Sequence, residues 1–300
     1  MGLPDFAIVG AMKAGTTSVA DTLRTHPDLY LPHSKEPHYY SDRETEWVFG
    51  DGRRRAMDYG IATEDGYRAL FAQAQGRLTG EASVQYLPDP VAARRLADAN
   101  PACKIILILR DPVARAYSAY NYVHAKGGDR SSFEDAVEQE MRGERDGHFY
   151  EYRYLHHGLY HRHLETWLAH FPAEQFLVCD FARLRDPGFY DHIARFLGVS
   201  DFPRAGETEA NQSFVPRSGI DRWVWSLVET ESWPKRILAR ALPHETLRYC
   251  KEAVRSGLAR RGVRPAPLSA DMSARLRTHF SEDQARLADR LARGDLRYVG

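Results

Sequence analysis

The 300-residue chain is predicted to fold as an α/β protein, a doubly wound parallel sheet flanked by helices. Three observations predict this. Short apolar segments alternate with helix-type segments from residue 6 to about residue 200. A Gly-rich turn joins the first strand to the first helix. From residue 207 the chain is mostly basic and rich in Ala and Arg, which predicts an appended C-terminal helical region, residues 207–300, on a core of residues 5–200 within one domain.

The strands are predicted from short apolar runs that end at turn residues. The run at 104–109 is continuous, as expected of a parallel strand buried on both faces. The strand at 30–31 ends at Pro32, and residues 39–60 are polar and irregular, which predicts a surface insertion. The five predicted strands are 6–9, 30–31, 78–81, 104–109 and 176–179.

The helices are predicted from their start and stop residues. Pro101 closes one helix, a second begins at Pro112, and Ser132 is a typical N-cap for a third. The predicted helices are 19–24, 64–73, 90–100, the two that begin at 112 and 133, 158–170 and 189–197.

Residues 6–18 have the strand–turn–helix pattern of a P-loop-like fold. Gly10 and Gly15 keep the spacing of the G-x-x-x-x-G-K-[ST] loop, but Thr16 stands where Lys is expected and Lys13 lies inside the loop. A helix N-terminus binds anions, and Lys13 adds positive charge, so a phosphate site without a magnesium clamp is expected; an ordinary strand–helix turn is the alternative. The predicted phosphate-binding residues are Lys13, Ala14, Gly15, Thr16, Thr17 and Ser18.

A second anion site is predicted after the strand at 104–109. Arg110 stands at its carboxyl end, where open α/β sheets bind ligands, and Ser118 lies about two turns into the next helix. A guanidinium with a nearby hydroxyl suits a terminal phosphate, because its fork matches the phosphate oxygens. Taken alone, Arg110 is better explained by a helix-capping or salt-bridging role; together with the first loop, a second phosphate site is the better interpretation.

With these two loops the chain resembles the sulfotransferases that use 3′-phosphoadenosine 5′-phosphosulfate (PAPS), in particular their heparan-sulfate and bacterial carbohydrate branch. Residues 35–42 resemble the family's K-E-P-H-F-F-D segment, and residues 80–86 its E-K-T-P-x-Y segment. Residues 158–198 resemble the later helix–strand–helix. The resemblance covers about residues 6–198, and the cysteine-stapled loop of the animal heparan-sulfate enzymes is not visible.

The resemblance implies that loop 13–18 binds the 5′-phosphosulfate and that Arg110 and Ser118 bind the 3′-phosphate. It also implies that Glu81 is the general base that takes the proton of the acceptor hydroxyl. The position of Glu81 after a short strand agrees with the ligand edge; a surface or ion-pairing carboxylate is the alternative. Ala82 follows it where the heparan enzymes have Lys, which leaves the electrostatics on the acceptor side open.

Three more residues are expected to act with Glu81. Lys13 would stabilise the leaving 5′-phosphate, and Lys35 and His38 would face the acceptor or the sulfuryl group. An ion pair with Glu36 or Asp42 is the alternative for Lys35. His38 is a rival base, because sulfotransferases for phenols and steroids use a His; a hydrogen-bonded core His is its alternative.

The sequence therefore predicts a PAPS-dependent O-sulfotransferase that works by in-line displacement, releases 3′-phosphoadenosine 5′-phosphate (PAP) and requires no metal. The expected acceptor is a hydroxyl on a carbohydrate or glycosylated molecule, bound by residues 41–60 and residues after 207; a small-molecule or natural-product hydroxyl is the second class. A P-loop small-metabolite kinase and a non-catalytic nucleotide-binding module are the alternatives from other classes. Arg217 is expected to complete the clamp on the 3′-phosphate, with a plain surface loop as its alternative.

Composition predicts a cytoplasmic enzyme. The 41 Lys and Arg balance 41 Asp and Glu, so no global field favours nucleic acid. The apolar runs are too short for membrane insertion, and the first strand starts too early for a signal peptide. The cysteines are expected to be reduced and mostly buried. The basic cluster 53–55 is read as solvated surface that a polyanionic acceptor could use.

A histidine cluster is predicted to be structural, and a tyrosine cluster has two possible roles. His157 and His161 share a helix face, but no H-E-x-x-H pattern occurs, so a metal site is not expected. We expect instead a helix that packs Tyr160 and Trp167 inward and leaves the histidines exposed to solvent. Tyr117, Tyr120 and Tyr122 either line the acceptor cleft or belong to the core.

Overall fold

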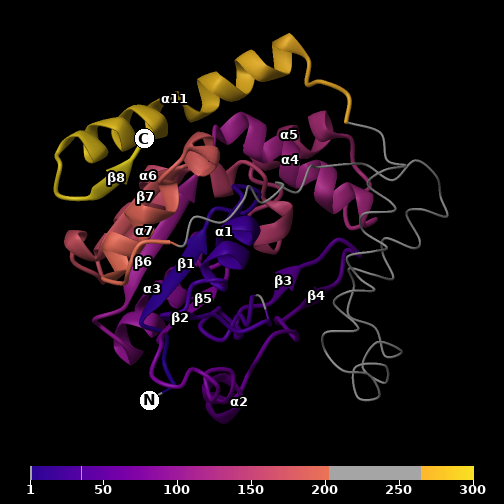
Figure 1. Cartoon of the computed structure of the whole chain (residues 1–300). Coiled ribbons are helices and arrows are strands. Elements are labelled where there is room, and N and C mark those ends of the chain that lie inside the picture. The colour runs from indigo at the N-terminus through magenta and orange to yellow at the C-terminus, as the bar shows by residue number, and fades with distance from the viewer. Residues whose placement is uncertain (1, 35, 203–264) are drawn as a thin grey trace.

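The computed structural model describes residues 2–34, 36–202 and 265–300 (Figure 1). Its centre is a six-stranded sheet of order β2-β5-β1-β6-β7-β8, and every neighbouring pair is parallel. The predicted doubly wound parallel sheet is thereby confirmed. From β1 the sheet extends through β5 to β2 on one side and through β6 and β7 to β8 on the other. The strands are β1 (Phe6–Gly10), β2 (Leu29–Tyr30), β5 (Leu78–Ala82), β6 (Lys104–Leu109), β7 (Phe176–Asp180) and β8 (Arg297–Val299).

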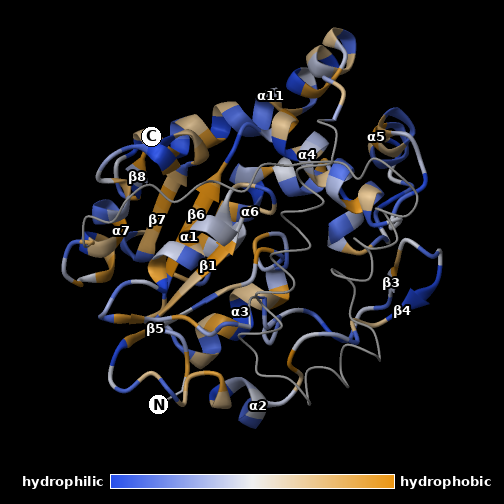
Figure 2. Cartoon of the chain, turned by 45° about the vertical axis from the view of Figure 1, so that its right-hand side comes forward, coloured by the Kyte–Doolittle hydropathy of each residue, from blue (hydrophilic) through white to orange (hydrophobic). Residues whose placement is uncertain are grey.

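Helices flank the sheet, and their starts follow from local chemistry. Asp89 caps α3 by accepting from the N–H of Val91, and Ser132 caps α5 by accepting from the N–H of Asp135. Figure 2 shows the central strands β1, β6 and β7 in the orange of apolar residues, which agrees with their burial on both faces. The helices are α1 (Thr16–Leu23), α2 (Glu64–Ala69), α3 (Pro90–Ala99), α4 (Pro112–Ala125), α5 (Phe133–Met141), α6 (Tyr160–Leu168), α7 (Phe189–Leu197) and α11 (Ala270–Ala292), with short 3₁₀ turns η1 (Tyr150–Tyr152), η2 (His156–Gly158), η3 (Ala173–Gln175) and η4 (Phe181–Arg185).

The expected irregular insertion at residues 39–60 is more ordered than predicted. It contains an antiparallel pair, β3 (Trp47–Val48) and β4 (Arg54–Arg55). Phe49 stacks on Phe149 at 4.9 Å, and Met57 and Tyr150 are buried with them in a separate apolar cluster. The polar composition hid this cluster because half of its side chains come from a segment about 100 residues away.

The C-terminal residues extend the sheet as well as adding a helix. β8 pairs with β7 in parallel, which the sequence analysis did not foresee, and Leu296 before it is buried in the main core. α11 packs on α6 and α4, and Figure 1 shows it running across both. Phe280 of α11 lies against Gly158, where a Cβ would come within 2.6 Å of the Phe280 ring. The glycine is therefore what lets this helix approach closely.

Two of the four histidines of the 156–163 segment, His157 and His163, are buried, so the prediction of solvent-exposed histidines is wrong for these two, whereas His156 and His161 are half-buried. His157 and His163 are 1% and 3% exposed, and His163 Nε2 lies 2.7 Å from the carbonyl oxygen of His156. Burial lowers the pKa of His163 to about 4 and that of His157 well below its usual range, so both rings are neutral at pH 7. α11 packs on α6, and helical spacing alone could not show which faces of this segment other elements cover.

Candidate active site

The loop between β1 and α1 has the backbone of an anion cradle. Gly15 precedes α1 with a φ of 81°, a conformation that favours glycine, and no side chain in the described part of the chain caps the helix. The first N–H groups of α1 therefore remain directed at the bend. Lys13 has a φ of 66°, a strained value for a residue with a Cβ, and such strain is concentrated at functional loops. Thr16 is buried, and Thr17 and Ser18 are half-buried.

The second loop meets the first at the carboxyl edge of the sheet. Arg110 directly follows β6, and its Nη1 donates to the carbonyl oxygen of Lys13 at 3.0 Å. Its guanidinium carbon lies 4.8 Å from the centre of the Phe181 ring. Burial lowers the pKa of Arg110, so an anion beside the guanidinium would stabilise its charge.

The hydroxyl of Ser118, on α4, is buried and unpartnered among the described residues. A buried polar atom without a partner is costly, and a phosphate oxygen would satisfy it. This orphaned donor is the observation that fits a 3′-phosphate at the place the sequence predicted.

Glu81 lies in β5 and is 2% exposed. Its Oε1 accepts a hydrogen bond from the hydroxyl of Tyr67 at 2.6 Å, and its Oε2 accepts from Ser83 at 3.0 Å and Tyr86 at 3.4 Å. Burial raises the pKa of Glu81 to about 7, while the three hydroxyls pull it down. The pKa of this carboxyl group therefore lies near neutral pH, where a general base works best.

His38 and Glu36 lie against the carboxyl end of β5. The N–H of Glu36 donates to the carbonyl of Ala82, and the N–H of His38 lies 3.4 Å from Ser83 Oγ, which in turn donates to Glu81. Glu36 and His38 have φ values of 59° and 53°, so this short segment holds two strained residues beside the carboxylate. Lys35 and Arg217, both predicted for the site, lie outside the described residues.

The side chain of Lys13 lies over an aromatic ring of α4. Its Nζ is 4.3 Å from the centre of the Tyr122 ring, and Lys126 Nζ is 3.8 Å from the same centre. Of the three tyrosines left open by the sequence, Tyr120 is buried in the core, and the Tyr122 ring contacts both Lys13 and Lys126.

A cavity of about 430 Å³ adjoins Lys126. Arg55 and Asp51, which line it, form an ion pair at 3.0 Å. Lys126 lies 3.9 Å from Glu151. Three cationic side chains and one carboxylate line the cavity, which is therefore polar and basic. The lining residues are Gly50, Asp51, Arg55, Lys126, Gly127, Gly128, Arg130 and Tyr152.

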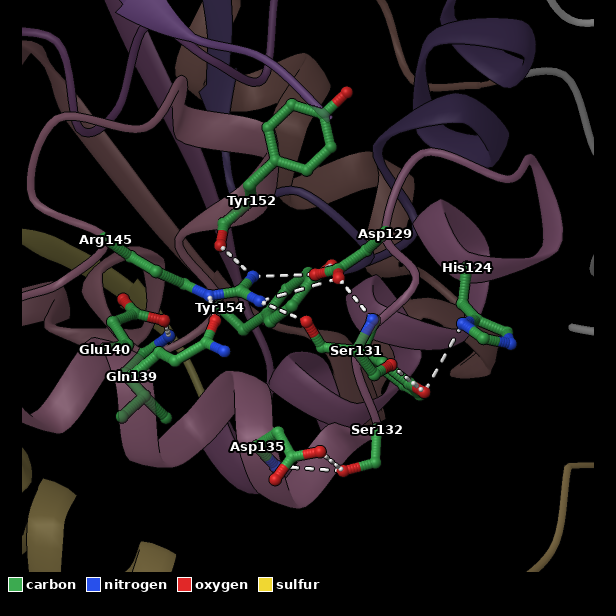
Figure 3. A network of polar contacts seen from close by, with 12 residues as sticks. His124, Asp129, Ser131, Ser132, Asp135, Gln139, Glu140, Arg145, Tyr152 and Tyr154 are labelled. Atoms are coloured by element: carbon green, nitrogen blue, oxygen red, sulfur yellow. Dashed lines mark hydrogen bonds and ion pairs between the residues drawn. The ribbon is translucent and has the colours of Figure 1, made fainter. Parts of the chain in front are cut away.

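A buried ion pair holds the loop that forms one wall of this cavity (Figure 3). Arg145 Nη1 lies 2.6 Å from Asp129 Oδ2, and the side chains are 4% and 6% exposed. Tyr154 donates to the same oxygen at 2.9 Å, and Arg145 also donates to Ser131 and to the carbonyl of Tyr152. The network connects residues 129–131 to the segment that follows α5. It therefore holds the loop of residues 126–130 in place beside the cavity.

The structure thus joins the predicted residues into two groups. Lys13 and Arg110 form one group, and Glu81 with the backbone of His38 forms the other. Strand pairing connects them, because Ala7 of β1 faces Glu81 in register. Sequence reasoning missed Tyr67 and the Asp129–Arg145 pair, since neither belongs to a motif. In the three described ranges no group of three or more His, Cys, Asp or Glu could hold a metal ion.

Residues 3–212 match the sulfotransferase domain. The chain belongs to the sulfotransferase family. It is 32% identical over 201 residues to human heparan sulfate glucosamine 3-O-sulfotransferase 3B1. The aligned residues make up 66% of this chain and 46% of the relative. It is 31% identical over 205 residues to human bifunctional heparan sulfate N-deacetylase/N-sulfotransferase 3, covering 66% of this chain and 22% of the relative. This sulfotransferase chain thus spans less than half the length of those curated relatives.

A solved structure agrees with this membership. The crystal structure of a sulfotransferase from Alicyclobacillus acidocaldarius superposes with a TM-score of 0.60 at 35% identity, over 70% of this chain and 87% of that one. The predicted family is therefore confirmed. Among the helices that the structure describes, none is long and apolar enough to cross a bilayer.

Proposed function

We propose that this protein transfers the sulfuryl group of PAPS to a hydroxyl of a carbohydrate acceptor and releases PAP. One observation carries the proposal: the Gly-rich loop and Arg110 meet at the carboxyl edge of the sheet, and the buried hydroxyl of Ser118, on the helix that follows Arg110, is unpartnered among the described residues. Bound PAPS supplies an activated sulfuryl group on a good leaving phosphate. Family membership favours this reaction over phosphoryl transfer by a small-metabolite kinase.

The donor side would be held by the chain's own cations and N–H groups. The N-terminus of α1 and Lys13 would bind the 5′-phosphosulfate, and Lys13 would stabilise charge on the leaving phosphate. Arg110 and Ser118 would bind the 3′-phosphate, and Arg217 would add to that clamp. Because the sulfuryl group carries less negative charge than a terminal phosphoryl group, these groups suffice without a metal.

On the acceptor side, Glu81 would take the proton of the attacking hydroxyl. A pKa of about 7 makes the carboxylate abundant at neutral pH and still a useful base. Since Glu81 is 2% exposed, the proposal requires the neighbouring segment to move when the acceptor binds, and the strained Glu36 and His38 lie there. Lys35 would face the acceptor, and His38 remains the rival base.

The basic cavity supports a carbohydrate acceptor that carries acidic groups. Its wall combines the cations of Arg55, Lys126 and Arg130 with polar backbone, which suits a hydrophilic, anionic ligand. Lys126, which lines the cavity, contacts the same Tyr122 ring as Lys13 of the proposed donor site. The names of both heparan sulfate relatives agree with such an acceptor. A cytoplasmic location stays a prediction that cell fractionation would test.

A thermal-shift titration tests the donor. PAP without metal should raise the melting temperature of the wild type by mass action and should fail to do so in Arg110→Ala. Stabilisation by ATP–Mg²⁺ alone would overturn the proposal in favour of a kinase. Heparan sulfate and a panel of small-molecule alcohols, each incubated with ³⁵S-labelled PAPS, would then separate the two acceptor classes.

A further inference from the structure

Tyr67 reaches the proposed base from outside every motif of the sequence. It lies on α2, its side chain is 0% exposed, and its hydroxyl is 2.6 Å from Glu81 Oε1. The other two hydroxyls, of Ser83 and Tyr86, both bind Oε2. Among the described residues, Oε1 therefore depends on Tyr67 for its hydrogen bond.

The tyrosine cluster holds the Tyr67 ring independently of that hydrogen bond. Tyr39 stacks on the ring with centroids 4.3 Å apart and planes 12° apart. Tyr40 and Phe71 meet it edge-on at 5.3 and 5.4 Å. Because these contacts involve the ring, a phenylalanine would keep the position and lose the hydroxyl alone.

Hydrogen bonds, rather than a cation, stabilise the charge of Glu81 in the described structure. No ion pair to this carboxylate occurs among the described residues. The groups that face it are Tyr67 from α2, Tyr40 from the preceding segment, Ser83 and Tyr86 after β5, and Cys103 before β6. Burial and the nearby carboxylate raise the pKa of Tyr67 well above its usual range, so its hydroxyl keeps its proton as a donor.

We propose that Tyr67 is a positioning residue of the transfer reaction: its hydroxyl orients the Glu81 carboxylate and keeps it charged for proton abstraction. The inference rests on the proposed function, in which Glu81 is the base. Removing a hydrogen bond to a buried charged group changes the pKa of that group by roughly one to two pH units. Loss of the hydroxyl should therefore raise the pKa of Glu81, because the charged form loses a donor.

Infrared titration of the protonated carboxyl band of Glu81 tests this without any ligand, in the full-length protein. The band is assigned by its absence in Glu81→Gln. Tyr67→Phe should move its midpoint upward by about one to two pH units. Tyr39→Phe is the matched control, because it removes a hydroxyl from the same cluster that makes no hydrogen bond to Glu81 in the described part of the chain. An unmoved midpoint in Tyr67→Phe would overturn the inference.

The pH–rate profile, measured with PAPS and the acceptor that the radiolabel assay identifies, gives a second readout. Tyr67→Phe should lower kcat about tenfold near pH 7, recover most of it near pH 9 and leave KM for PAPS unchanged. A loss of kcat that is equal at all pH values would mean a merely structural role and would contradict the inference. Full activity in Glu81→Gln would instead defeat the proposed base, whatever the infrared midpoint of Tyr67→Phe shows.

Discussion

At the residue scale, Ser118 and Glu81 are two buried polar groups with opposite surroundings. Ser118 lacks a hydrogen-bond partner among the described residues, whereas Glu81 has three donors but no counter-ion there. A buried hydroxyl without a partner lowers stability, and so does a buried carboxylate once it is ionised. Each cost is expected at a site that gains its partner only with the ligand.

Ser118→Ala should weaken PAP binding without weakening the fold. The free protein loses no hydrogen bond, so its melting temperature should stay level or rise, while the lost contact to a charged oxygen should raise the Kd for PAP about tenfold or more. Titration calorimetry measures the Kd. Ser132→Ala is the control: it removes the N-cap of α5, so it should lower the melting temperature and leave the Kd unchanged. An unchanged Kd in Ser118→Ala would contradict the role of Ser118.

The raised pKa of Glu81 also predicts how stability depends on pH. Folding raises this pKa from 4.5 to about 7, so the folded state binds the proton more tightly than the unfolded chain. Its contribution is complete below pH 4.5 and is lost as the pH rises through 7. Relative to Glu81→Gln, the wild type should therefore lose on the order of 3 kcal/mol between pH 4.5 and pH 8.

Urea denaturation at several pH values measures that difference. Glu144→Gln, which changes an exposed carboxylate, should follow the wild type throughout. A constant difference between wild type and Glu81→Gln would mean that Glu81 does not titrate in this window.

At the element scale, the loop after α4 depends on the buried Asp129–Arg145 pair. This loop carries one wall of the basic cavity, and the pair ties it to the segment after α5 (Figure 3). Removing one partner of a buried pair leaves an unpaired charge, which is strongly destabilising. The loop should then lose its fixed position relative to Lys126.

Arg145→Met should lower the free energy of unfolding by about 3–5 kcal/mol and raise KM for the acceptor more than KM for PAPS. Arg142→Met is the control, because Arg142 pairs with Glu144 on the surface, where ion pairs contribute little. Denaturant unfolding and steady-state kinetics provide the two readouts. Equal changes in both KM values would argue against a specific role of this loop in acceptor binding.

At the scale of the whole molecule, the C-terminal residues belong to the packed core. β8 closes one edge of the sheet, and α11 buries Leu276, Phe280 and Leu287. A helix that was merely appended would melt on its own, whereas one that covers α6 and α4 should melt with the sheet.

Phe280→Ala should therefore destabilise the entire fold by about 3–5 kcal/mol, because it leaves a cavity against Gly158. Circular dichroism and intrinsic fluorescence should show one shifted transition. Arg286→Ala, on the exposed face of the same helix, should leave the transition in place. A separate early transition that involves a small loss of helix would show that α11 is independent of the core.

The sequence by itself determined five of the six strands of the central sheet, the two loops predicted to bind phosphate and the family, because apolar runs, glycines and capping residues act over a few neighbouring positions. Helix α7 and strand β6 have the predicted bounds. The place of Arg110 against Lys13 also followed, since parallel strands bring their carboxyl ends to one edge.

Only the tertiary structure decided the surroundings of these residues. The burial of Glu81, its contact with Tyr67 from α2 and the unpartnered hydroxyl of Ser118 depend on segments that are distant in sequence. The same holds for the buried His157 and His163, and for β8, which is three residues long and far in sequence from the strand it joins. Periodicity describes one element at a time, whereas burial and hydrogen bonding depend on which elements the chain brings together.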